Sequence, residues 1–306
     1  MAIKVISPGA LTTVQDGGRF GYQNTGIGVG GCMDMNSYRR ANYLVGNEAG
    51  EAVLEFTLIG GVLELTENTV LALSGADMSP RRNGEPVSMN VPLLFHTGDT
   101  LELGMAQSGC RCYLAPAGGI DVPLYLGSRS TNLKCRFGGF QGRALQKGDI
   151  LNIGVNGKNY EQVRDRKCAG EVYSGTVTVH VIEGPQAEYF TKKGRKTFYR
   201  GTYTVSDKSD RMGCRMDGPA IESCNGTDII SDGIAPGSVQ VPADGKPIVL
   251  LADRQTTGGY AKIATVCSTD IPRLAQCKPG DKVRFRKISP EEAQKRIREE
   301  RKHELQ

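Results

Sequence analysis

The sequence predicts a mainly β protein with two β-barrel domains and a few short helices. Glycine accounts for 40 of the 306 residues, tryptophan is absent and aromatic residues make up 6%, which is typical of short strands joined by tight turns. Apolar and polar residues alternate along several segments, as in strands with one buried face. A glycine-aspartate pattern recurs in both halves of the chain, which indicates a duplicated domain.

The length and one polar segment predict where the two domains divide. The chain is about twice as long as a usual domain of roughly 150 residues. Residues 156–175 are polar and basic and lack a sustained apolar period, so they are the candidate linker. We therefore expect an N-terminal barrel over residues 1–165 and a C-terminal barrel with a helical tail over residues 166–306.

Strands are expected wherever apolar residues recur at every second position. In chain order these segments include residues 62–65, 101–103, 176–182 and 283–285. The pattern Gly-Asp-x-apolar-x-apolar occurs at residues 98–103, 148–153 and 280–285. Each copy is interpreted as a turn that enters a strand, and similar residues precede the second and third copies. The simplest explanation is a duplicated barrel.

The first and last of the expected helices have clear ends. Asp34 precedes apolar residues at helical spacing, and Gly46 can end that helix in the left-handed conformation. The last helix follows Ser289, which begins a capping box, and its charges pair at i and i+4. Only Ala293 and Ile297 are spaced to face a core, so we expect a solvated tail.

Two further helices are expected in the C-terminal half. Pro185 suits the first position of a helix that Gly194 would end. Asp270 is placed to cap another short helix around Leu274.

Charge and hydropathy argue against nucleic-acid and membrane partners. The net charge is +5 and the pI about 8.7, but much of the excess is local, at residues 164–167 and 192–196, as on a solvated face. The longest apolar stretches, such as residues 247–252, are far shorter than the roughly 20 residues that span a bilayer. We therefore expect neither nucleic-acid binding nor a membrane span.

The cysteines and the N-terminus predict a reducing, cytoplasmic location. The nine cysteines are scattered without a C-x-x-C pair, so they are interpreted as reduced core residues. The first 16 residues lack the basic and then apolar pattern of a secretion signal.

The scarcity of histidine restricts the chemistry. The three histidines, His96, His180 and His303, are interpreted as structural, and no His or Cys pair occurs at zinc spacing, so no metal site is predicted. No P-loop is present. Residues 26–31 match G-x-G-x-x-G, but no buried strand precedes them. This loop either presents backbone N–H groups to an anion at the following helix or simply forms a turn.

Four clusters of polar and turn-forming residues have the character of a binding site. They are residues 12–19, residues 126–131 with 137–143, residues 206–215 and residues 253–260. Arginine in such clusters can bind carboxylate or phosphate with two hydrogen bonds, and hydroxyls or amides beside glycine can hold a carbonyl oxygen. Structural ion pairs at strand ends are the alternative for any one cluster. We predict that the arginines share one groove with three aspartates: Arg129, Arg143, Arg211, Arg254, Asp16, Asp210 and Asp253.

The same clusters resemble a known family almost from end to end. The matching stretches are TTVQDGGRFGYQNTGIGVGGCMDMNSYRRANYLVGN, LYLGSRST, FGGFQGRAL, SDRMGCRMDGPAI and PIVLLADRQTTGGYAKIATV. They resemble the family variously called allophanate hydrolase subunit 2, KipA or the C subunit of 5-oxoprolinase (PxpC). The resemblance implies two cyclophilin-like β-barrel domains, in agreement with the duplicated turns. It also implies a KipI-like partner chain, which is the B subunit of 5-oxoprolinase.

The resemblance implies three alternative functions. The favoured one is a subunit of ATP-dependent 5-oxoprolinase, which opens 5-oxo-L-proline to L-glutamate together with the A and B subunits and uses ATP with Mg. The second is the carboxyltransferase component of a biotin-dependent urea carboxylase. The third is a regulatory protein that binds and antagonises a KipI-like kinase inhibitor. Phosphoryl transfer suits arginine-rich and glycine-rich clusters, because it needs positioning and positive charge more than a histidine nucleophile.

The clusters and the resemblance together nominate two sets of site residues. The expected catalytic residues are Asp16, Arg129, Asp210, Arg211, Asp253 and Arg254. The expected substrate-binding or nucleotide-binding residues are Arg19, Gly28, Gly30, Asp34, Ser130, Arg143, Gln255, Thr256, Thr257, Gly258 and Tyr260.

Overall fold

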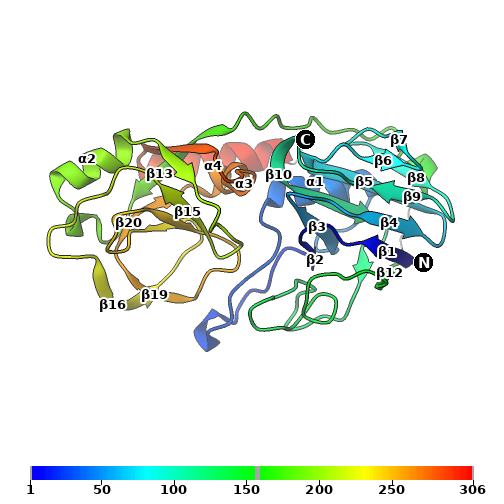
Figure 1. Ribbon diagram of the computed structural model, residues 1–306, viewed down its shortest axis with the longest axis horizontal. Helices are drawn as coiled ribbons and strands as arrows, with labels where there is room; N and C mark the ends of the chain where they lie inside the picture. The colour runs from blue at the N-terminus through cyan, green and yellow to red at the C-terminus, as the bar shows by residue number, and fades with distance from the viewer. Residues whose placement is uncertain (1, 156–158, 305–306) are drawn as a thin grey trace. The chain divides into compact units, whose positions relative to one another are not determined.

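The computed structural model describes residues 2–155 and 159–304, which form two compact units. Unit 1 comprises Met1–Phe20 and Gly30–Tyr173, and unit 2 comprises Gly21–Val29 and Ser174–Gln306. Both are built mainly from strands, with a few short helices, as the sequence predicts (Figure 1). The division after Tyr173 falls within residues 156–175, the expected linker, although beyond residue 165, where the sequence analysis divides the two domains.

The segment expected to be a linker packs on unit 1. Val163 is 1% exposed and lies in an apolar cluster of that unit, with Tyr160 packed against the same cluster. The 3-10 helix η2 (Tyr160–Gln162) is capped by Asn159 in a reciprocal capping box. These contacts place the division later than polarity alone indicates, whereas residues 156–158 of the expected linker lie outside the described residues.

The strands of unit 1 form two sheets. The seven-stranded sheet has the order β11-β12-β1-β4-β9-β6-β7, and the five-stranded sheet has the order β2-β3-β10-β5-β8. The strands of the larger sheet are β1 (Ala2–Ser7), β4 (Val62–Leu65), β6 (Arg81–Arg82), β7 (Glu85–Pro86), β9 (Thr100–Glu102), β11 (Ile120–Asp121) and β12 (Ile150–Ile153). Those of the smaller sheet are β2 (Thr12–Gln15), β3 (Val53–Thr57), β5 (Thr69–Asp77), β8 (Pro92–Phe95) and β10 (Ser108–Pro116).

Both sheets of unit 1 contribute to one apolar core. Ile3 and Leu63 come from the larger sheet and Leu54 and Leu73 from the smaller one, and none is more than 1% exposed. Alternation along a strand sends every second side chain to the same face, so this single core requires the period of two seen in the sequence.

Helix α1 (Met35–Val45) covers the opposite face of the smaller sheet. Its apolar residues pack with Val53 and Tyr113 in a second cluster. The Asp34 carboxylate accepts hydrogen bonds from the N–H groups of Asn36 and Ser37, and Gly46 ends the helix with φ of 78°. The predicted helix, with its predicted first and last signals, is confirmed.

Unit 2 contains a closed barrel. Its strand order is β13-β20-β17-β18-β15-β14-β21, and β13 pairs in parallel with β21. Two further strands, β16 (Asp228–Gly233) and β19 (Thr257–Tyr260), form a separate antiparallel ribbon (Figure 1). The barrel strands are β13 (Thr176–Glu183), β14 (Tyr203–Val205), β15 (Gly213–Asp217), β17 (Ser238–Gln240), β18 (Ile248–Leu250), β20 (Lys262–Val266) and β21 (Lys282–Lys287).

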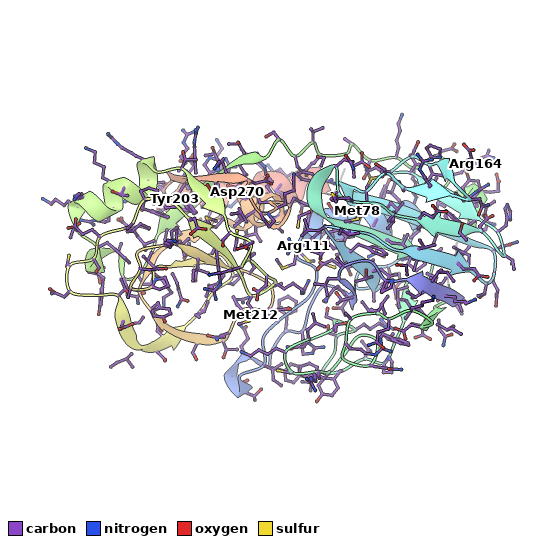
Figure 2. All side chains as sticks on the ribbon, viewed as in Figure 1. Met78, Arg111, Arg164, Tyr203, Met212 and Asp270 are labelled. Carbon is purple, nitrogen blue, oxygen red and sulfur yellow. The ribbon has the colours of Figure 1, made fainter. Side chains whose placement is uncertain are left out.

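Short helices complete unit 2. They are η1 (Gln23–Thr25), η3 (Ala187–Tyr189), α2 (Lys192–Arg200), η4 (Ser268–Asp270), α3 (Ile271–Ala275) and α4 (Pro290–Glu304). Phe198 of α2 stacks on Phe285 with 4.4 Å between ring centroids. Both rings lie beside Tyr203, which is labelled in Figure 2. In the tail helix α4, Ala293 and Ile297 pack against the rest of the unit, as predicted.

Three of the predicted helix signals act differently. Pro185 lies in a turn before η3, and α2 begins after Thr191, which caps it. Gly194 lies inside α2 rather than at a helix end, and a side chain there would approach the Glu222 carbonyl oxygen to 2.1 Å. Asp270 makes no capping hydrogen bond to α3, and its carboxylate binds the ring Nδ1 of His180 at 2.7 Å. The contacts of Gly194 and Asp270 are with residues distant in sequence.

The three Gly-Asp patterns are one turn used three times. Each glycine has a positive φ, of 85° at Gly98, 91° at Gly148 and 93° at Gly280, a conformation that glycine adopts without strain. In each copy the aspartate carboxylate accepts the N–H group three residues earlier at 2.7–2.9 Å, and the aspartate N–H donates back to the carbonyl of that residue. The strands that follow are β9, β12 and β21.

None of the helices in the described part of the chain is long and apolar enough to cross a membrane. The nine cysteines are free, as expected, although Cys135 and Cys224 are exposed rather than part of a core.

Candidate anion-binding site

A pocket of about 590 Å³ lies in unit 2 and brings together two of the four predicted clusters. Its walls come from β15, β18 and the ribbon strand β19, with the segments that precede and follow them. Among the residues nominated from sequence, those that line it are Asp210, Arg254, Gln255, Gly258 and Tyr260.

Arg254 supplies a positive charge at this pocket. The residue is 6% exposed, and its guanidinium donates to the carbonyl oxygens of Ile234 and Leu251, each at 3.3 Å. Burial lowers the pKa of this guanidinium, although an arginine remains charged in a protein. No carboxylate in the described chain forms an ion pair with it. A buried charge without a counter-ion is unfavourable, so the pocket is suited to an anion that supplies one.

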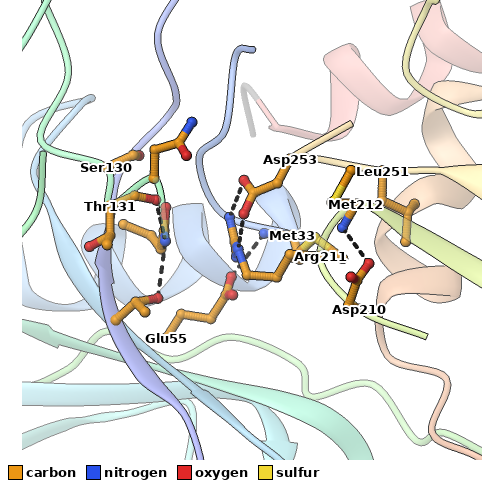
Figure 3. A network of polar contacts seen from close by, with 12 residues as sticks. Met33, Glu55, Ser130, Thr131, Asp210, Arg211, Met212, Leu251 and Asp253 are labelled. Carbon is orange, nitrogen blue, oxygen red and sulfur yellow. Dashed lines mark hydrogen bonds and ion pairs between the residues drawn. The ribbon is translucent and has the colours of Figure 1, made fainter. Parts of the chain in front are cut away.

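Arg211, which was expected to act in the same way, has an internal carboxylate partner. Its Nε and Nη2 donate to the two carboxylate oxygens of Asp253 at 2.8 and 3.1 Å (Figure 3). The two side chains are only 6% and 13% exposed, and neither residue lines the pocket. The pair joins the segment before β15 to the segment after β18. Arg211 and Asp253, both expected to be catalytic, therefore lie together but outside the lining of this pocket.

Asp210 shapes the rim of the pocket. Its carboxylate accepts the N–H groups of Met212 at 2.8 Å and Gly213 at 3.1 Å (Figure 3). These bonds fix the turn that leads into β15. Asp210 therefore lines the pocket, while its hydrogen bonds serve the backbone.

The ribbon forms the opposite wall, and sequence reasoning missed one residue that holds it. Gln240 of β17 is 5% exposed, and its side-chain amide donates to the Tyr260 carbonyl oxygen at 3.2 Å. A side chain at Gly258 would come within 2.7 Å of that amide, so the Gln240 side chain would have to shift. Gln255 and Thr257 are exposed. The alternating pattern of β17 gave no sign that Gln240 would turn toward the site.

The comparisons with known proteins cover this site. Residues 25–287 match the family described as carboxyltransferase domain, subdomains A and B. The chain belongs to this carboxyltransferase domain family. It is 38% identical over 301 residues to the C subunit of 5-oxoprolinase from Escherichia coli K12, covering 98% of this chain and 96% of the relative. It is 34% identical over 297 residues to the C subunit of 5-oxoprolinase from Haemophilus influenzae, covering 96% and 93%. The crystal structure of the Kluyveromyces lactis urea amidolyase matches with a TM-score of 0.88 and 31% identity over 96% of this chain and 19% of that one.

In this carboxyltransferase domain, Asp16 of unit 1, which was expected to be catalytic, lies in a buried hydrogen-bond network. Its carboxylate accepts hydrogen bonds from the Gly18 and Arg129 N–H groups and from the hydroxyls of Ser128 and Ser130. A carboxylate has about four acceptor positions, so these bonds occupy it. Ser130, expected to bind substrate, belongs to the same buried network.

Arg19 and Arg143, both expected to bind substrate or nucleotide, make contacts within unit 1. Arg19 is 1% exposed, donates to the carbonyls of Tyr125 and Ser130, and lies 4.8 Å over the Phe137 ring. Arg143 forms two hydrogen bonds, of 2.7 and 2.8 Å, with the carboxylate of Asp149. Neither residue lines the pocket of unit 2.

The four arginines and three aspartates of the predicted groove are divided between the two units. Asp16, Arg129 and Arg143 belong to unit 1, and the other four residues belong to unit 2. The Arg129 side chain donates to the Val122 carbonyl oxygen at 3.3 Å and lies 3.8 Å from the Glu51 carboxylate.

After the glycine-rich loop, groups of the chain itself bond to the residues that begin α1. Asp34, expected to bind a ligand, itself caps α1, and its N–H donates to the Tyr113 hydroxyl at 2.8 Å. The Met33 N–H donates to the Glu55 carboxylate at 2.9 Å (Figure 3). Glu55 and Tyr113 are buried and were missed, because their strands show no polar cluster in the sequence.

The two loop glycines nominated as binding residues have different surroundings. Gly28 is in unit 2, where a side chain would lie 3.0 Å from the Arg254 carbonyl oxygen. Gly30 has a φ of 65°, which favours the turn-forming interpretation. The described residues include no group of three or more His, Cys, Asp or Glu side chains arranged to hold a metal ion.

Proposed function

We propose that this chain is the C subunit of an ATP-dependent 5-oxoprolinase and that Arg254 binds the carboxylate of 5-oxo-L-proline. The observation that carries the proposal is the buried Arg254 at a pocket wall, without a counter-ion among the described residues. 5-Oxoproline is an anion, and a guanidinium can bind a carboxylate through two parallel hydrogen bonds. The relatives named as C subunits of 5-oxoprolinase, which match over nearly their whole length, support the same interpretation.

The chemistry of the complete enzyme explains why a binding subunit of this kind is useful. Transfer of a phosphoryl group from ATP to the lactam oxygen activates an otherwise inert amide and releases ADP. Water then adds to the activated carbon, the C–N bond breaks to free the amine, and a second water hydrolyses the resulting acyl phosphate to glutamate and phosphate. A fixed substrate carboxylate orients the lactam for these steps. We place the nucleotide in the complex with the A and B subunits, of which the latter is the KipI-like chain.

The second candidate is a carboxyltransferase component that acts with biotin on urea or a related amide. The family match and the likeness to a urea amidolyase favour it. Urea carries no charge, so under this activity Arg254 would bind the carboxylate of the carboxybiotin donor or of the carboxylated product rather than the acceptor. A regulatory protein that antagonises a KipI-like partner is the third candidate, and it requires no turnover.

The deciding experiment is an assay of glutamate release from 5-oxo-L-proline and ATP by the chain purified together with the A and B subunits. We expect ATP-dependent release from the complex and none from this chain alone. Arg254→Met should raise the KM for 5-oxoproline by roughly 10- to 150-fold, the equivalent of about 1.5 to 3 kcal/mol for a charge-assisted contact.

Arg284→Met is the matched control, since Arg284 is exposed on β21 and bonds to Thr202. Its KM should equal that of the wild type. An unchanged KM in Arg254→Met would remove Arg254 from the site. Biotin-dependent carboxylation of urea without glutamate release would establish the second candidate, and binding to the KipI-like chain with neither activity would establish the third.

A further inference from the structure

The ribbon of β16 and β19 is largely exposed, yet it forms a wall of the pocket. It is a two-stranded sheet outside the closed barrel, and Gly258, Gly259 and Tyr260 of β19 line the pocket. The register of β16 shifts between Asp228 and Asp232, and Ile230 in this irregular stretch is 93% exposed. A wall with so few buried apolar contacts needs another means of staying in place.

Lys262, the first residue of barrel strand β20, provides such a contact. It is 3% exposed, and its ammonium donates to the Asp232 carboxylate at 2.7 Å and to the Gly233 carbonyl oxygen at 3.3 Å. Both acceptors are on the ribbon. The Asp232 side chain is 54% exposed, so the pair joins a buried cation to a solvent-facing strand. The hydrogen bond from Lys262 lowers the pKa of Asp232, which keeps the carboxylate charged at neutral pH.

Two further contacts of the ribbon involve residues that line the proposed substrate site. The amide of Gln240 holds the Tyr260 carbonyl, and the Arg254 Nε donates to the carbonyl of Ile234, the residue that follows β16. Displacement of the ribbon would therefore remove a pocket wall and one of the hydrogen bonds that orient the Arg254 guanidinium.

We propose that Lys262 and Asp232 are positioning residues that latch the ribbon in place as a wall of the pocket. If the pair is broken on the aspartate side, the buried ammonium loses its counter-ion and regains hydration only when the ribbon moves away. The latch is a property of unit 2 alone. Its effect on 5-oxo-L-proline rests on the proposed function.

Hydrogen exchange of the full chain tests the latch without any ligand. We expect the ribbon amides, at residues 228–233 and 257–260, to exchange about tenfold faster in Lys262→Met and Asp232→Asn than in the wild type. Lys262→Arg, which retains the charge, should restore slow exchange. Lys246→Met is the matched control, because Lys246 also pairs with an aspartate, Asp217 at 2.6 Å, but both side chains are exposed and lie outside the ribbon. The ribbon amides of Lys246→Met should exchange at the wild-type rate.

Binding of 5-oxo-L-proline supplies the second readout. In the assembled enzyme, Lys262→Met should raise the KM about five- to tenfold with little change in kcat, and Lys262→Arg should recover it. Ribbon exchange in Asp232→Asn equal to that of the wild type would overturn the latch. If Lys262→Met unfolds the barrel, Asp232→Asn still tests the latch, because Asp232 is largely exposed and its replacement should leave the barrel folded. If the wild type neither binds nor turns over 5-oxoproline, the proposed function fails, and the exchange data still judge the latch.

Discussion

Arg211 and Arg254 are the same residue type in neighbouring polar clusters, and their surroundings give them different roles. Arg211 has a carboxylate partner in Asp253, whereas Arg254 donates to two backbone carbonyls. The sequence predicts both as candidate catalytic residues, because similar polar and turn-forming residues surround each of them. Which arginine is paired depends on contacts between loops about 40 residues apart, which no local pattern encodes.

This difference predicts that replacing Arg211 and replacing Arg254 change the free energy of unfolding by different amounts. Arg211→Met leaves the nearly buried Asp253 carboxylate without its guanidinium and should lower the free energy of unfolding by about 3 kcal/mol. Arg254→Met removes a buried charge that has no counter-ion among the described residues, so the free energy of unfolding should stay within about 1 kcal/mol of the wild type or rise. Urea unfolding of both variants measures this. A large loss of stability in Arg254→Met would mean that its backbone hydrogen bonds are its main contribution.

Asp34 gives a prediction at one helix end. Its carboxylate caps α1 through two N–H groups and also accepts from the Ser37 hydroxyl at 2.6 Å. Asp34→Ala should destabilise the protein by about 1 to 2 kcal/mol, whereas Asp34→Ser, which can still cap, should recover most of the loss. Thermal unfolding compares the two. Equal losses in both variants would show that the cap is not the source of the effect.

At the scale of elements, the sequence predicts the features that depend on neighbouring residues but not those that depend on tertiary contacts. The Gly-Asp turns and helix α1 follow from residues within a few positions of one another, so the sequence alone predicts them. Gly194 is required by the backbone of Glu222, and Asp270 binds a histidine 90 positions away. A glycine or aspartate near an expected helix end therefore cannot be assigned to it until tertiary contacts are known.

The second Gly-Asp turn has a pH dependence that can be measured. The hydrogen bond from Arg143 lowers the pKa of Asp149 below its usual 3.8. A carboxyl with a lowered pKa in the folded state stabilises fully above its unfolded pKa, and this contribution is lost as the pH falls through the folded value. The stability difference between the wild type and Asp149→Asn should thus be constant from about pH 5 to 8 and shrink below about pH 4. A constant difference down to about pH 2 would contradict this origin.

At the scale of the whole molecule, the sequence predicts the mainly β class and two units but not how the chain is shared between them. The division follows Tyr173, because the polar segment before it packs on unit 1. The segment Gly21–Val29 belongs to unit 2, although its neighbours on both sides belong to unit 1. A contact between segments so far apart in the chain leaves no local pattern in the sequence. Composition alone therefore could not assign residues 21–29 to unit 2.

Gly28 tests this discontinuous part of unit 2. Gly28→Val should crowd the Arg254 carbonyl oxygen, lower the free energy of unfolding by about 1 to 3 kcal/mol and weaken 5-oxoproline binding in the complex. Gly17→Ala is the control, since a side chain there meets nothing within 4 Å and should change neither quantity. Wild-type stability and affinity in Gly28→Val would show that the segment is not required for the site.

The discontinuity of unit 2 also sets the order in which the molecule can be completed during translation. Gly28 leaves the ribosome long before the Arg254 backbone against which it packs has been made. At about 5 to 20 residues per second, the early segment waits roughly 10 to 50 s for its partner. Unit 1 can form during that interval, while the barrel cannot be finished until its last strand has emerged. The nascent chain should therefore be most sensitive to protease within residues 21–29, and it should lose that sensitivity only after the barrel strands have been released.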